Sequence, residues 1–297
     1  MRSSRLVVGA LVVLALAVGV VVGLAAPRDG GTSNATPSSG IDEISSQLAE
    51  HDAWLADVST AAIAGRLDGL SVAVLVADGA PSATVDQVTS AITDAGGSVG
   101  VEATMSADWW TPDLAAFRAE LADQMAGSVV GAEGLPATQV LQDAIVQALI
   151  PAAVPAGVAP TTDQGGSDLS SVLLEILTRS GLVNLSAPAS GPVDALVIVA
   201  GDGPEGAGTV ADLAASEWER YMSATLVVVA GKTDMPSVAE EAMAHGQEIS
   251  ADVRPSIVVA AQPALVPAQV VFALTEQFAG GSGTYGTAED LPLIAKP

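Results

Sequence analysis

The chain contains no cysteine, and it has few of the other side chains that usually carry chemistry. Among its 297 residues are two histidines, six methionines and three phenylalanines. Without cysteine the protein has no disulfide and no thiolate nucleophile, so an exported domain must be held by ordinary packing. The sequence also lacks the G-x-S-x-G motif, and a Ser-His-Asp triad would have to use His245. We therefore predict that the protein is not an enzyme.

Basic residues are also scarce. Ten lysines and arginines stand against 34 acidic residues, which gives a formal net charge of −24. A field of this sign repels phosphate backbones, so the sequence argues against nucleic-acid binding. The charge is explained by the need to keep an exported protein rich in alanine and valine soluble. The alternative explanation is a surface that collects cations.

Long apolar runs are absent after the N-terminus, where Leu6–Ala26 holds 21 residues without a charge. At about 1.5 Å per residue this helix would span a bilayer of roughly 30 Å. Arg2 and Arg5 precede it, and this bias predicts a cytoplasmic N-terminus and an exported remainder. We therefore expect a transmembrane anchor at residues 1–28, with a cleaved signal peptide as the alternative. A single span cannot line a pore.

A tether and a helical stalk are expected next. Residues 29–40 are small and polar, as in flexible linkers. Within the expected stalk, residues 41–66, apolar positions recur at alternating spacings of three and four: Ile41, Ile44, Leu48, His51, Leu55, Val58 and Ala62. Two interpretations stay open. The seam pairs two chains, with His51 as a metal ligand or register switch, or the helix docks on its own domain.

Residues 67–286 alternate short apolar runs with amphipathic stretches, which is typical of an α/β domain. The expected strands are 71–77, 98–103, 195–200, 225–230 and 256–261. The expected helices are 82–95, 113–125, 137–149, 167–179, 209–222, 237–244 and 267–278. The predicted fold is thus an N-terminal transmembrane helix and a short coiled-coil-like stalk before a three-layer, mostly parallel Rossmann-like sheet. Residues 287–297 form a tail.

Any ligand crevice in such a sheet is expected at the carboxyl ends of its strands. One of these ends, Gly201–Gly206, fits G-x-G-x-x-G. Asp202 and Glu205 place negative charge where a pyrophosphate would bind, and Pro204 removes a backbone donor. A plain glycine-rich turn is therefore favoured over a nucleotide site, and a metal-binding acidic loop of Asp202 and Glu205 is the other candidate.

The soft metal ligands available are the methionines and the two histidines. Only Met243 and His245 lie close together in sequence, near the end of an expected helix. A thioether with an imidazole is a reasonable ligand pair for Cu(I), so copper is the possible cofactor. The alternative makes the methionines core residues and His245 a cation at a helix C-terminus.

Trp109 and Trp110 stand side by side before an expected helix. Exposed, such a pair would contact a carbohydrate or a protein. The structural alternative is that these rings fix the start of the helix against its neighbour.

Four pieces of the chain together resemble the actinobacterial family of the mycobacterial copper transport protein B. They are the membrane segment with its stalk, Ala64–Val74, Ile92–Gly97 and Ala268–Gly286. The last piece resembles the family's leucine-rich helix, glycine turn and Tyr-Gly pair. The resemblance implies a cell-envelope protein of copper export or homeostasis, and it carries over no ligand residue.

From these observations we expect an envelope protein, anchored by a single membrane pass, that serves copper efflux or copper homeostasis. The alternative is a non-catalytic envelope scaffold that self-associates through its stalk and docks a protein or an envelope polymer. The candidate metal ligands are Met243, His245, Asp202 and Glu205.

Overall fold

The computed structural model describes residues 37–150, 155, 166–187, 193–200, 225–230, 256–259 and 262–286. The chain divides into two compact units, Met1–Leu55 and Ala56–Pro297. Helix α2 (Pro37–Ile63) contains the boundary between them. The predicted domain limits, with a stalk at 41–66 and an α/β domain at 67–286, remain a prediction.

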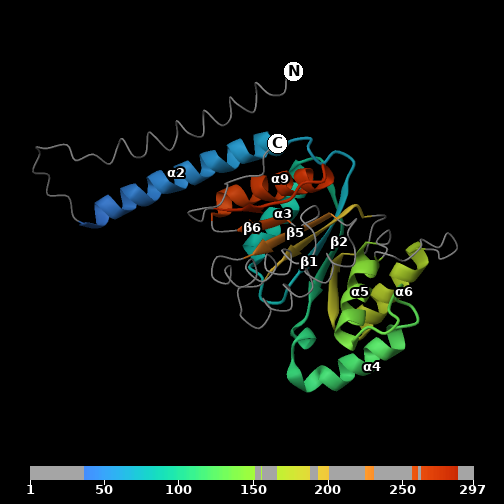
Figure 1. Ribbon diagram of the computed structural model, residues 1–297. Coiled ribbons are helices and arrows are strands. Elements are labelled where there is room, and N and C mark those ends of the chain that lie inside the picture. The colour runs from blue at the N-terminus through green and yellow to red at the C-terminus, as the bar shows by residue number, and fades with distance from the viewer. Residues whose placement is uncertain are drawn as a thin grey trace, which may run out of the picture. The chain divides into compact units, whose positions relative to one another are not determined.

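One seven-stranded sheet forms the centre of the second unit (Figure 1), with the strand order β3-β2-β1-β4-β5-β6-β7. All neighbours are parallel except β2 and β3, which are antiparallel. The strands are β1 (Ser71–Val76), β2 (Ser98–Met105), β3 (Val183–Ala187), β4 (Ala195–Val199), β5 (Thr225–Ala230), β6 (Ser256–Val259) and β7 (Thr284–Tyr285).

Helices cover both faces of this sheet. One face packs against α3 (Ser82–Asp94), α9 (Val266–Phe278) and the end of α2. The other packs against α4 (Ala115–Met125), α5 (Ala137–Leu149) and α6 (Gly166–Arg179). Three short 3-10 turns, at Ala107–Trp109, Pro112–Leu114 and Pro263–Leu265, lead into neighbouring elements.

Strand β1 contributes to both cores. Val72, Val74 and Val76 belong to the core under α3 and α9, and Ala73 and Leu75 belong to the core under α4, α5 and α6. Because successive side chains of a strand point to opposite faces, a strand covered on both sides must be apolar throughout. This is why the sequence shows uninterrupted apolar runs here.

The turn from α3 into β2 depends on glycine. Gly97 N–H donates to the carbonyl of Ile92 at 2.9 Å, and Gly96 N–H donates to that of Thr93 at 3.0 Å. These two bonds end the helix in a Schellman motif, which places a residue at positive φ. Gly96 takes that position with φ of +85°, and a Cβ there would lie 1.9 Å from a carboxylate oxygen of Asp68.

The C-terminal end of α2 is fastened within the second unit. Ser59 Oγ donates to the carbonyl of Ala264 at 3.2 Å, and Ile63 is fully buried. Just after the helix, the Arg66 guanidinium stacks on the Phe272 ring at 4.3 Å. Burial lowers the pKa of Arg66 from its ordinary value. These contacts join α2 to α9 and to the turn before it.

The domain is α/β and its sheet is mostly parallel, as predicted, with one antiparallel pair that makes it mixed, β2 and β3. The predicted fold class was wrong in its transmembrane helix. In the part of the chain that the structure describes, no helix is long and apolar enough to cross a membrane. The longest of the described helices, α2, carries acidic residues such as Glu43 and Glu50. The expected span, Leu6–Ala26, lies outside the described residues.

Shortening a buried side chain of β1 tests the two-sided core. Leu75 is fully buried, so Leu75→Ala should lower the free energy of unfolding by about 2–5 kcal/mol through lost contacts and a cavity. Phe117→Ala is the control, because Phe117 on α4 is 42% exposed and its loss should change stability far less. Urea denaturation measures both, and equal effects would contradict the burial described.

Candidate functional site

The strand order reverses between β1 and β4. The chain leaves β1 through α3 toward β2 on one side of the sheet order, whereas β4 is followed by β5 on the other side. Open α/β sheets bind ligands where the strand order reverses in this way, outside the carboxyl ends. Ala77 N–H bonds the carbonyl of Val199 at 2.9 Å, so the two strand ends lie level.

The described residues at this edge offer little chemistry. Asp78 and Gly79 follow β1 and are exposed, and Ala200 follows β4 and is buried. Ala200 N–H donates to the carbonyl of Val229 at 2.8 Å, which continues the edge to β5. Among the residues described at the switch point, Asp78 has the one side chain of a type that metals bind, and a single carboxylate does not make a site.

All four predicted metal ligands lie outside the described residues. Asp202 and Glu205 follow β4 in the sequence, and Met243 and His245 lie between β5 and β6. The glycine motif Gly201–Gly206 lies outside as well. Within the described ranges, no three side chains of histidine, aspartate or glutamate lie close enough to hold a metal ion.

Two of the methionines are core residues. Met105 at the end of β2 and Met125 at the end of α4 are fully buried, in the same core as Trp109. Thioether side chains fill irregular gaps in such cores. The structural interpretation is therefore correct for these two methionines, and their sulfur atoms do not face solvent.

The tryptophan pair is structural too. Trp109 is 6% exposed, and its indole N–H donates to the carbonyl of Leu182 at 2.7 Å. Trp110 is half-buried and packs against the same core. The Trp109 ring thus joins the turn after β2 to the chain that enters β3.

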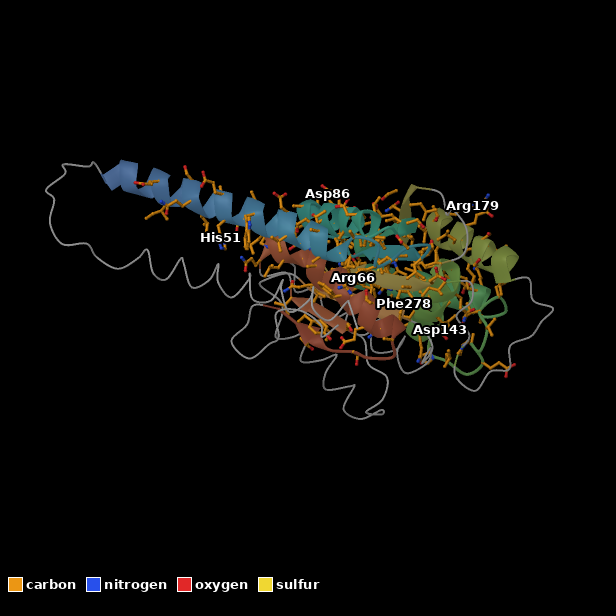
Figure 2. The ribbon with its side chains drawn as sticks, turned by 90° about the horizontal axis from the view of Figure 1, so that it is seen from above. His51, Arg66, Asp86, Asp143, Arg179 and Phe278 are labelled. Carbon is orange, nitrogen blue, oxygen red and sulfur yellow. The ribbon has the colours of Figure 1, made fainter. Side chains whose placement is uncertain are left out.

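In the first unit, the predicted apolar seam of α2 has an exposed part and a buried part. Ile44 and Leu48 are 67% and 61% exposed, whereas Leu55 is 6% exposed. Between them, the His51 ring lies 6.3 Å from the ring of Trp54. Among the described residues, His51 Nε2 is buried and has no hydrogen-bond partner. Figure 2 shows His51 along this helix.

A cluster near the C-terminal end of α9 was not predicted. The Tyr285 hydroxyl donates a hydrogen bond to the Glu276 carboxylate, while Gln277 Nε2 donates to Ser256 Oγ at 3.1 Å. A Cβ at Gly283 would lie 2.2 Å from the Tyr285 hydroxyl oxygen, so a larger residue there would displace the Tyr285 ring. The sequence pattern that could have predicted this cluster is the glycine run before the Tyr-Gly pair.

This cluster is structural rather than catalytic. We call it the clasp, because it fastens α9 to the sheet. Ser256 begins β6, and β7 pairs in parallel with β6, so the cluster lies at the amino edge of these strands, opposite the switch point. Burial raises the pKa of the Glu276 carboxyl above its usual range. The C-terminal piece Ala268–Gly286 therefore holds α9 against β6 and β7.

The raised pKa of Glu276 predicts a pH dependence of stability. A carboxyl whose pKa is higher in the folded state stabilises the protein most below its unfolded pKa, and that contribution is lost as pH rises through the folded pKa. Glu276→Gln keeps an acceptor for Tyr285 and removes this titration. Melting temperature against pH should therefore fall more steeply from pH 4 to 7 in the wild type, and parallel curves would contradict this.

One family comparison covers nearly the whole chain. The model of the family described as "Copper transport outer membrane protein, MctB" matches residues 4–292. No curated protein matches the chain. The family name denotes copper transport and an outer-membrane or envelope location, and MctB is not a known enzyme family. A match of this extent includes both compact units. The chain therefore belongs to the MctB family of copper transport outer membrane proteins.

Proposed function

We propose that this protein serves copper efflux or copper tolerance in the cell envelope, with its α/β unit outside the cytoplasm and without catalysing a reaction. The observation that carries the proposal is the family match over residues 4–292. The family's printed function agrees with the resemblance derived from the residues themselves. The lack of cysteine restricts any copper ligands to methionine, histidine and oxygen donors.

The proposed ligands are Met243 and His245, with Asp202 and Glu205 as additional oxygen donors. Two facts support this choice. Met105 and Met125 are fully buried and are used for packing. All four candidates also lie in connections that follow β4 or β5, whose carboxyl ends belong to the switch-point edge. Thioether and imidazole groups suit Cu(I), whereas carboxylates suit harder cations.

A Cu(I) titration of the full chain against a competing chelator tests this site. Met243→Leu with His245→Gln should weaken Cu(I) binding by at least about tenfold, because the variant lacks both soft donors. The matched control is Met105→Leu with Met125→Leu. It removes two thioether groups at positions that the structure assigns to the core.

The control should bind Cu(I) as the wild type does. Equal affinity of both variants and the wild type would remove Met243 and His245 as ligands. If the wild type does not bind above the chelator, direct copper binding by this chain is wrong as well. Thermal melts of each variant show whether folding has changed.

A second candidate function is a scaffold that self-associates through α2 and docks a protein or an envelope polymer. The specific observation is the exposure of Ile44 and Leu48, which belong to the heptad seam. The acidic residues Asp42, Glu43 and Glu50 occupy heptad positions away from this seam, so they do not oppose pairing directly. Exposed apolar side chains at a/d spacing are typical of helices that pair.

Ile44→Ser with Leu48→Ser should reduce self-association of the full chain by at least about tenfold, since the apolar seam drives pairing. Ala49→Ser with Ala53→Ser is the control, because these residues are exposed and lie off the seam. Sedimentation equilibrium compares the three proteins. A loss of association in the control, or none in the seam variant, would contradict pairing through α2.

A further inference from the structure

We draw no further inference here: the strongest candidate, the apolar groove of about 310 Å³ between helix α6 and strand β3 that Leu174, Thr178 and Leu185 help to line, carries no proposal because nothing in the part of the chain that the structure describes shows what covers it.

Discussion

The rest of the domain depends on the burial of β1 and β4 on both faces. Alternate residues of each strand supply two separate cores, so neither helical layer packs without this pair. At the amino end, Ser71 N–H donates to an Asp194 carboxylate oxygen at 2.8 Å, and Asp194 N–H donates to the carbonyl of Ser71 at 2.8 Å. The two strands are thus fixed level with each other. Their carboxyl ends form the switch point, where open α/β sheets bind ligands.

Structural and chemical tasks are divided along the chain. In the described residues the soft sulfur atoms of Met105 and Met125 are packed in the core, and the C-terminal piece of the family resemblance closes α9 on the sheet through Glu276 and Tyr285. The family match over residues 4–292 therefore includes many positions that maintain the fold. Copper chemistry, as proposed, falls on the connections that follow β4 and β5 in the sequence.

The sequence predicted the buried elements well because burial on both faces demands uninterrupted apolar runs. Strand β5 and helix α5 have the predicted limits, and α3, α6 and α9 differ by one residue at one end. Strand β3 was missed because its open face is polar, with Asn184 and Ser186 breaking the run. The two-residue β7 was missed because it depends on a tertiary contact, the bond from Tyr285 to Glu276. The contact between Glu276 and Tyr285 could not be predicted from the sequence either, because it forms only in the folded domain. The expected transmembrane helix rested on the length of the uncharged run Leu6–Ala26 and on the arginines before it. That segment lies outside the described residues, and no described helix is long and apolar enough to cross a membrane.

The central claim is that this MctB family member lowers the copper load of the cell that makes it. The most direct measurement is the copper content of cells grown in copper-supplemented medium, determined by mass spectrometry with and without the gene for this chain. Our account predicts that cells without it accumulate more copper, and that the restored wild-type gene returns the copper content to its original level. Equal copper content in all three strains would contradict a role in copper efflux.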